Sequence, residues 1–245
     1  MSSSAPQQPA RDLRFFLTVP HSCSYLAGRE ATTLFLDPQE TPGQSVYDSL
    51  ALLGFRRSGR HLYRPHCEGC CACISVRIPV DDFIPNRTQR KLLRRNSDIS
   101  VHVRPAVFDA EHYALYAHYI RVRHADGDMY PPSHEQYRTF LTLDHPYARL
   151  LEFRHDEQLL AVAAIDRLNH GLSAIYTFFD PSPRFDRRSL GTYAILRQIA
   201  MAREHGLPHV YLGYWIRESR KMNYKQTFHP LEYLEGRHWR RSIPL

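Results

Sequence analysis

Alternating apolar and polar positions mark the second half of the chain as rich in strands. Three such runs, Ala148–Arg154, Gln158–Leu168 and Leu172–Phe179, are separated by turn residues at 155–157 and 169–171. Strands that are joined by turns this short pair with one another in antiparallel fashion. The pattern therefore predicts a three-stranded antiparallel meander.

A helix and a further strand follow the meander. Apolar residues at helical spacing predict a helix over Ser189–His205, and the apolar run His209–Ile216 indicates another strand. A strand, a helix and a strand in this order form a βαβ-like unit, whose two parallel strands can separate at one end. The first backbone N–H groups of the helix point into that opening, so an anion is the expected ligand. The residues expected around this anion are Arg184, Arg187, Arg188, Ser189, Leu190, Gly191 and Thr192.

Both kinds of element are also expected before the meander. Strands are predicted over Thr32–Leu36, Cys73–Val80 and Ile99–Val103, and helices over Gln44–Leu53, Asn86–Asn96, Ala110–Arg123 and 133–143. Asp109 stands directly before one of these helices and Ser133 begins another, and both are typical N-cap residues.

This order of elements resembles the α+β arrangement of the acetyltransferase-like (GNAT) fold, whose sheet opens between its fourth and fifth strands. We expect that fold together with a smaller amino-terminal domain that contains the cysteines. Pro105 interrupts a strand, so the boundary is predicted within Arg104–Phe108. The prediction is a disordered tail over 1–12, an amino-terminal domain over 13–105 and a carboxy-terminal domain over 106–245.

Positive charge is concentrated on the predicted helix Asn86–Asn96. The chain has a formal net charge of +7, and no acidic residue occurs from Ile84 to Ser97. The basic residues of this helix are Arg87, Arg90, Lys91, Arg94 and Arg95. Without acidic neighbours one turn away these charges repel one another unless an external anion neutralises them, which favours RNA. The alternative is an ordinary solvated helix face.

Four of the five cysteines lie within seven residues. Cys67, Cys70 and Cys71, together with Cys23, are candidate ligands for zinc or for an iron–sulfur cluster. The alternative is a set of reduced thiols with structural or redox-sensitive roles, with Cys73 as the remaining member. The chain has no apolar run long enough to span a bilayer and no apolar signal-peptide core, so we expect a cytoplasmic location.

Several short motifs are spread over both halves of the chain. They are Cys23-x-Tyr25, Phe55-Arg56-Arg57-Ser58-Gly59, Tyr63-Arg64-Pro65, Cys70-Cys71, Ser75-Val76-Arg77, Thr177-Phe178-Phe179-Asp180-Pro181, Ser189-Leu190-Gly191-Thr192-Tyr193, Tyr211-Leu212-Gly213-Tyr214-Trp215-Ile216 and Lys221-Met222-Asn223-Tyr224-Lys225. Together they resemble the arginyl-tRNA–protein transferase family, and most of all its shorter bacterial branch, the aspartate/glutamate leucyltransferases. The resemblance extends roughly from Phe15 to Trp239. One departure is Leu26, which stands where the eukaryotic members have the second cysteine of a Cys-x-x-Cys pair.

The resemblance implies transfer of leucine from leucyl-tRNA to the α-amine of proteins that begin with Asp or Glu. This is aminolysis of an activated ester, so no cofactor is required. An N-terminal amine has a pKa near 7.7–8.0, so a modest base suffices and the enzyme mainly holds the reactants together and stabilises the oxyanion. The rival interpretations are an acetyl-coenzyme A-dependent N-acetyltransferase and a non-enzymatic RNA-binding metal module.

The same resemblance gives candidate roles to particular residues. Asp180 is the candidate for orienting or deprotonating the amine, with a turn-capping role as the alternative. Tyr176, Tyr214 and Tyr224 are candidate hydrogen-bond donors to the leaving ribose hydroxyl or to the oxyanion, with packing as the alternative. Lys221 and Lys225, four residues apart, are expected on one helix face that holds the acceptor end of the tRNA, with Tyr224 beside them. A guanidinium is the expected partner of the acidic acceptor side chain. The available arginines are Arg56, Arg57, Arg64 and Arg77, with a structural salt bridge as the alternative for each.

Overall fold

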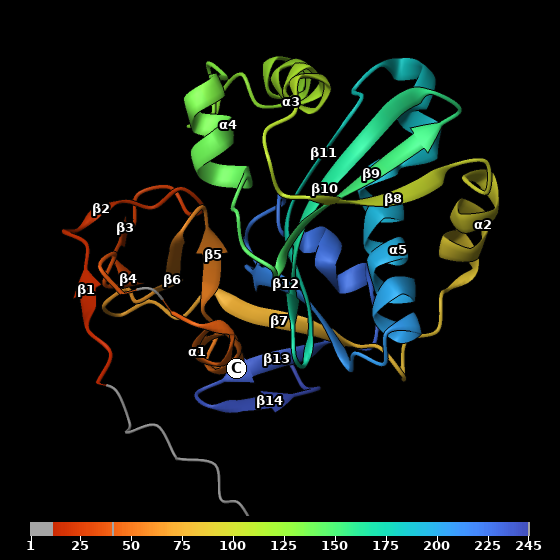
Figure 1. Ribbon diagram of the computed structural model, residues 1–245. Helices are drawn as coiled ribbons and strands as arrows, with labels where there is room; N and C mark the ends of the chain where they lie inside the picture. The colour runs from red at the N-terminus through yellow and green to blue at the C-terminus, as the bar shows by residue number, and fades with distance from the viewer. Residues whose placement is uncertain (1–11, 41, 245) are drawn as a thin grey trace, which may run out of the picture.

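An eight-stranded mixed sheet forms the centre of the molecule (Figure 1). The computed structural model describes residues 12–40 and 42–244, so the predicted tail over 1–12 lies almost entirely outside the described residues. The strand order is β14-β13-β7-β12-β11-β10-β9-β8. These strands are β7 (Ile74–Pro79), β8 (Ser100–Pro105), β9 (Ala148–His155), β10 (Gln158–Leu168), β11 (Gly171–Phe179), β12 (His209–Trp215), β13 (Glu232–Glu235) and β14 (His238–Arg240).

The meander predicted over 148–179 is confirmed as β9, β10 and β11, each antiparallel to the next. The predicted parallel pair is confirmed as β11 and β12. Their pairing is short, because only Leu172↔Val210 and Ser173↔Tyr211 are in register. Beyond that second pair the two strands separate, and we call this place the β11–β12 divergence.

Helices cover both faces of the sheet, so the chain has two apolar cores. One core lies under α2 (Arg87–Arg95) and α5 (Leu190–Glu204). The other lies under α1 (Gln44–Leu52), α3 (Ala110–Arg123) and α4 (His134–Leu141). Buried apolar side chains on alternate positions of the strands serve the two cores, which is why the central strands are apolar along their whole length.

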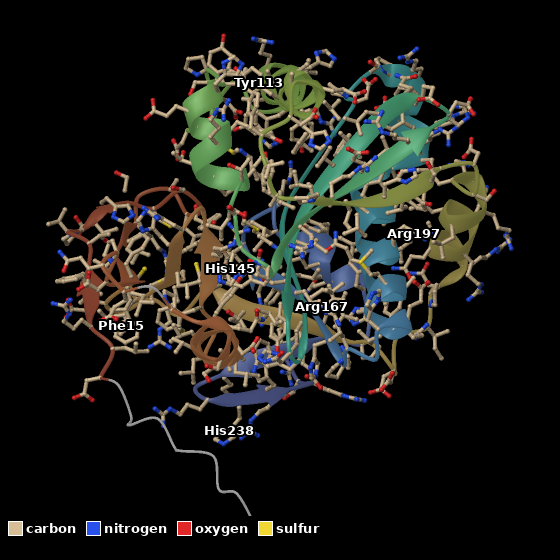
Figure 2. The ribbon with its side chains drawn as sticks, in the orientation of Figure 1. Phe15, Tyr113, His145, Arg167, Arg197 and His238 are labelled. Carbon is tan, nitrogen blue, oxygen red and sulfur yellow. The ribbon has the colours of Figure 1, made fainter. Side chains whose placement is uncertain are left out.

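A separate four-stranded sheet in the order β1-β4-β6-β5 stands beside the second core. Its strands are β1 (Phe15–Leu17), β4 (Thr33–Leu36), β5 (Arg56–Ser58) and β6 (His61–Pro65), and a two-stranded ribbon is formed by β2 (His21–Ser22) and β3 (Glu30–Ala31). Side chains fill the space between this amino-terminal part and the central sheet (Figure 2). The predicted cysteine-containing segment therefore packs onto the rest of the chain.

The predicted boundary at residue 105 falls between strands of one sheet. β7 and β8 come from the amino-terminal side of it, whereas β9 to β14 come from the carboxy-terminal side. β7 lies inside the sheet, antiparallel to β12 on one edge and to β13 on the other. The two expected domains thus share a sheet, and the division at 105 stays a prediction.

Helix starts agree with the expected caps. The Asp109 side chain accepts hydrogen bonds from the N–H groups of Glu111 and His112, and Ser133 accepts one from Gln136. Asn86 and Gln89 cap α2 reciprocally.

The hairpin β13–β14 was not predicted, because its strands are short and mostly polar. The short strands β1, β2, β3 and β5 were not predicted either, nor were two 3₁₀ helices, η1 (Pro183–Arg188) and η2 (Asn223–Thr227).

Candidate functional site

Arg56 fills the β11–β12 divergence with its guanidinium. It projects from β5, donates from Nη1 to Ser173 Oγ at 2.9 Å and to the Tyr211 carbonyl at 3.4 Å, and donates from Nη2 to the Ala174 carbonyl. The two carbonyls belong to the separating strands, so Arg56 supplies hydrogen bonds where strand pairing has ended. Gly213 leaves room for it, since a Cβ there would lie 3.3 Å from Arg56 Nε on a backbone with φ of +80°.

Lys225 enters the same region from η2. Its Nζ donates to the Tyr214 carbonyl at 2.6 Å and contacts Met222 Sδ at 3.0 Å. Only 3% of the residue is exposed. Burial and, second to it, the charge of Arg56 lower the pKa of Lys225 to about 7. Among the described residues, neither Arg56 nor Lys225 forms an ion pair with a carboxylate.

The expectation that Lys221 and Lys225 share a helix face is wrong. The segment forms only the short 3₁₀ helix η2, which begins after Lys221. Lys221 is exposed, while Lys225 turns inward to the backbone of β12. A single polar-looking run therefore contains one surface cation and one buried cation.

The candidate tyrosines differ in what their hydroxyls do. The Tyr214 hydroxyl donates within the fold, to the carbonyls of Gly54 at 3.0 Å and Tyr63 at 3.3 Å. The Tyr176 hydroxyl is buried and has no hydrogen-bond partner among the described residues. Burial raises the pKa of both groups, so both are protonated near neutral pH. Tyr224 is 46% exposed, and its ring lies 5.1 Å from Lys225 Nζ.

Asp180 directly follows β11 and organises the turn after that strand. Its Oδ1 accepts hydrogen bonds from the backbone N–H of Ser182, at 2.9 Å, and from the Ser182 hydroxyl. Its other oxygen lies 3.7 Å from Arg184. These contacts match the turn-capping alternative, and the role of Asp180 in amine activation stays a prediction.

An aromatic cluster surrounds the last residue of β11. The Phe179 ring lies 4.9 Å from the Tyr119 ring and 5.9 Å from the Arg123 guanidinium. Gly191 at the start of α5 lies against the same ring, since a Cβ there would be 3.4 Å from it. His124 packs 5.1 Å from Tyr119. Tyr119 and Arg123 had no signal in the sequence, because α3 is distant from β11 along the chain.

The two predicted RNA-binding groups are neighbours in space. All five basic residues of α2 have exposed side chains. At the end of that helix, Arg95 donates to the Arg187 carbonyl at 2.6 Å and Asn96 donates to the Arg188 carbonyl at 3.0 Å. The basic face of α2 thus adjoins η1 and the start of α5. Arg188 itself pairs with Asp98 through two contacts of 2.8 Å.

Three of the four arginines in the predicted acceptor pool have partners elsewhere in the fold. Arg57 is buried against Asp166, with contacts of 2.7 and 2.8 Å. Arg77 pairs with Glu232 at 2.7 Å and stacks 4.3 Å from the Trp239 ring. Arg64 donates to the Leu53 carbonyl at 3.2 Å and lies over Phe55. Arg56 is the member of the pool that lies at the divergence.

The cysteines are reduced in the structure. Cys23, Cys67 and Cys70 lie close enough to Cys73 that their charges, after burial, contribute to raising its pKa to about 12. Within the part of the chain that the structure describes, no three Cys, His, Asp or Glu side chains are gathered as metal ligands. Metal binding at Cys23, Cys67, Cys70 and Cys71 stays a prediction.

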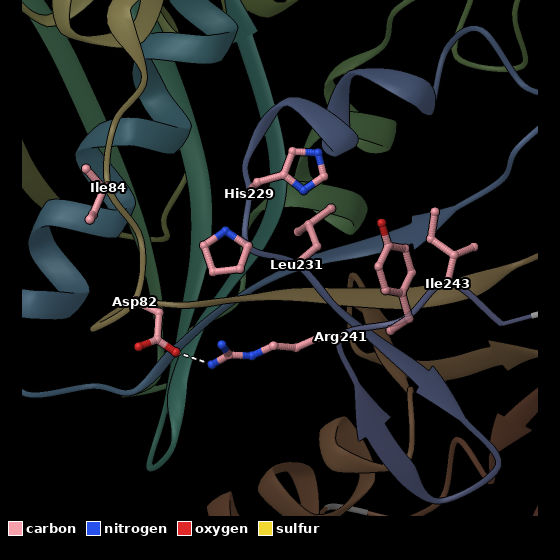
Figure 3. A pocket seen from close by; sticks show the side chains of 8 residues that line it. Asp82, Ile84, His229, Leu231, Arg241 and Ile243 are labelled. Carbon is pink, nitrogen blue, oxygen red and sulfur yellow. Dashed lines mark hydrogen bonds and ion pairs between the residues drawn. The ribbon is translucent and has the colours of Figure 1, made fainter.

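One cavity lies away from these residues. It has a volume of about 500 Å³ and is lined by the loop before α2 and by the segment around β13 and β14 (Figure 3). Arg241 and Asp82 form an ion pair at its edge. None of the candidate site residues predicted from the sequence lines this cavity.

No helix of the described residues is both long and apolar enough to cross a membrane.

Comparison with known proteins gives matches along nearly the whole chain. Residues 21–91 match the family "Arginine-tRNA-protein transferase, N terminus", and residues 111–235 match "Arginine-tRNA-protein transferase, C terminus". The aspartate/glutamate leucyltransferase of Chromohalobacter salexigens is 78% identical over 245 residues, which are 100% of this chain and 99% of that protein. The aspartate/glutamate leucyltransferase of Marinobacter nauticus is 54% identical over 94% of this chain and 96% of its own length. Among solved structures, the crystal structure of FemX is 11% identical and superposes with a TM-score of 0.48, covering 92% of this chain and 86% of that chain.

Proposed function

The chain belongs to the arginine-tRNA–protein transferase family, and from that premise we propose that it transfers leucine from leucyl-tRNA to the α-amine of proteins that begin with Asp or Glu. The observation that carries this proposal is the 78% identity, along the full length, to a protein named for that activity. Leucyl-tRNA and the acceptor protein are its two partners, and such a donor implies a cytoplasmic reaction.

The reaction exchanges one acyl bond for another. The neutral α-amine attacks the ester carbonyl, the new C–N amide bond forms, and the ester C–O bond to the terminal ribose breaks. The proton that the amine loses ends on the departing ribose hydroxyl. An amine with a pKa near 8 is partly neutral at neutral pH, so holding the reactants together and stabilising the oxyanion account for most of the required acceleration.

The donor side of the site is proposed along α2 and the start of α5. The basic residues of α2 would contact phosphates of the acceptor stem, and the N–H groups of 190–192 would face the terminal nucleotide. The Phe179 and Tyr119 rings with Arg123 offer a surface on which its base can stack. This part of the chain is proposed to be GNAT-like, because its two parallel neighbours separate after two residue pairs.

Tyr176 is the proposed donor to the oxyanion. Its hydroxyl is protonated and lacks a partner among the described residues, so a substrate oxygen is a suitable acceptor. We expect Tyr176→Phe to lower kcat by about 100-fold, as removal of a single oxyanion donor does elsewhere. An unchanged kcat would assign the hydroxyl to packing alone.

The test of the activity uses purified protein, leucyl-tRNA labelled in the leucine, and a peptide that begins with Asp. Label is expected in the peptide. The matched control is the same peptide with an acetylated amine, which should receive none because the nucleophile is blocked. Labelled acetyl-coenzyme A is supplied in a parallel reaction, and transfer from it alone would refute the proposal in favour of an acetyltransferase.

A further inference from the structure

Arg56 and Lys225 form a pair of buried cations at one place in the sheet. Both donate to backbone carbonyls of β12, those of Tyr211 and Tyr214, on either side of Gly213. Only 8% of Arg56 and 3% of Lys225 is exposed. Burying one cation without a counter-ion is costly, and burying two next to each other is more so. Such a pair is expected where a bound anion completes the site.

We propose that Arg56 and Lys225 bind the side-chain carboxylate of the acceptor protein's first residue, and so select Asp or Glu. This inference rests on the proposed function, because it assigns one subsite of that reaction. The amine to be acylated is separated from the carboxylate by only the side-chain carbons of one residue. Fixing the carboxylate therefore also fixes the nucleophile beside the β11–β12 divergence.

The hydrogen-bond donors of the pair suit a carboxylate. A guanidinium has five N–H groups and an ammonium has three. Arg56 uses three of them on Ser173, Ala174 and Tyr211, and Lys225 uses two on Tyr214 and Met222. The pair thus retains donors without a partner among the described residues. A planar carboxylate accepts from two or three such donors at once.

The charges of Arg56 and Lys225 also favour a bound carboxylate. Arg56 helps to lower the pKa of Lys225, and no Asp or Glu of the described residues opposes that effect. Besides Lys225, the groups whose pKa the charge of Arg56 influences are the tyrosines 47, 63, 214 and 224, all of which are neutral when protonated. A carboxylate bound between the two cations would relieve their repulsion and raise the pKa of Lys225. Binding an acidic acceptor should therefore be coupled to uptake of a proton.

A phosphate of the tRNA is the other anion to consider, and the structure favours the carboxylate. The exposed cations of α2 already provide a surface for phosphates. The Arg56–Lys225 pair is instead enclosed by tyrosines and strand backbone, where a single planar monoanion is the better fit. The experiment distinguishes the two.

The experiment compares acceptor peptides that begin with Asp and with Asn, which have nearly the same shape but differ in charge. The ratio of their kcat/KM values with leucyl-tRNA is measured for the wild type, Arg56→Gln, Lys225→Met and the control Arg203→Gln. Arg203 is matched because its guanidinium also donates to backbone carbonyls, those of Val80 and Phe83. Both kcat/KM values of a ratio are measured on one preparation of each variant. A smaller fraction of folded protein therefore lowers both values equally and leaves their ratio unchanged.

We expect the wild type and Arg203→Gln to favour Asp by at least about 30-fold, as buried charge pairs at interfaces do. Arg56→Gln and Lys225→Met should reduce the preference to within about threefold. Unchanged ratios in both variants would overturn the inference. So would a loss of leucyl-tRNA binding at a constant Asp-to-Asn ratio, because that result assigns the pair to phosphate.

A second readout is independent of transfer. Titration calorimetry of the Asp and Asn peptides, without tRNA, in buffers of different ionisation enthalpy counts the protons taken up. At pH 8 the Asp peptide should take up close to one proton more than the Asn peptide, and Lys225→Met should abolish the difference. If leucine transfer failed while this difference persisted, the proposed function would fall and the carboxylate site would stand; equal uptake for both peptides would overturn the site.

Discussion

Replacing Asp166 with Asn should destabilise the protein strongly, because this carboxylate joins three separate elements in the core. It accepts from Arg57 of β5 at 2.7 and 2.8 Å and from the Tyr47 hydroxyl of α1 at 2.7 Å, while it belongs to β10. Its exposure is 0%, and that of Arg57 is 3%. The variant leaves a buried guanidinium without its counter-ion.

Removing one partner of a buried ion pair typically costs about 3–5 kcal/mol of unfolding free energy. For a chain of this length each kcal/mol lowers Tm by roughly 2–4 °C. The expected loss for Asp166→Asn is therefore about 6–20 °C, measured by circular dichroism at pH 7. Replacing both charges, as Arg57→Met with Asp166→Leu, should recover part of the loss, because no uncompensated charge is left buried.

The control is the pair of Arg188 with Asp98, which also makes two hydrogen bonds, both of 2.8 Å, but has an Asp98 side chain that is 42% exposed. Exposed pairs contribute about 0–1 kcal/mol, so Asp98→Asn should shift Tm by less than about 4 °C. The expected difference in Tm between Asp166→Asn and Asp98→Asn comes from the burial of the first pair. Equal small decreases in Tm for the two variants would refute this reasoning.

Three further predictions concern other parts of the molecule. The pKa of Lys225 is lowered in the folded state from 10.5 to about 7, so between these pH values the unfolded chain binds more protons than the folded chain. The free energy of unfolding should therefore rise with pH, by up to about 1.4 kcal/mol per pH unit. Urea titrations at several pH values should show this rise in the wild type and a smaller one in Lys225→Met. Arg90→Gln and Arg94→Gln should each reduce the slope of log affinity for leucyl-tRNA against log salt by about one without a change in Tm, and an unaltered slope would count against phosphate contacts on α2. Gly59→Ala should destabilise the chain by more than about 2 kcal/mol, because the new Cβ would overlap the Thr139 carbonyl on a backbone with φ of +56°. Gly28→Ala should cost less, since its φ is similar but nothing lies within 4 Å, and equal losses would contradict the role of the overlap.

The local part of the fold follows from the sequence. The meander, the helices α1 to α5 and the caps at Asp109 and Ser133 depend on residues within one or two turns of each other, and these were predicted. The separation of β11 from β12 was also expected from the order of elements. The spacing of apolar residues predicted these elements because a helix and a strand each bury one face, and the residues of that face recur with a different period in each.

The site depends on contacts that no local pattern contains. Arg56 donates to Ala174 and Tyr211, more than 100 residues away, and three other arginines of the same pool are indistinguishable from it in the sequence. Lys225 was expected beside Lys221 on one helix face, yet its Nζ is directed to the backbone of β12. Which cation is exposed and which is buried is decided by tertiary packing.

The position of β7 inside the central sheet has a consequence for biosynthesis. β7 is complete at Pro79, but its two neighbours begin only at His209 and Glu232. At a synthesis rate of about 5–20 residues per second, the strand waits roughly 6–26 seconds on the ribosome with both edges unpaired. An apolar strand in that condition invites pairing with other chains, so nascent molecules of this protein should depend on a holding chaperone during translation.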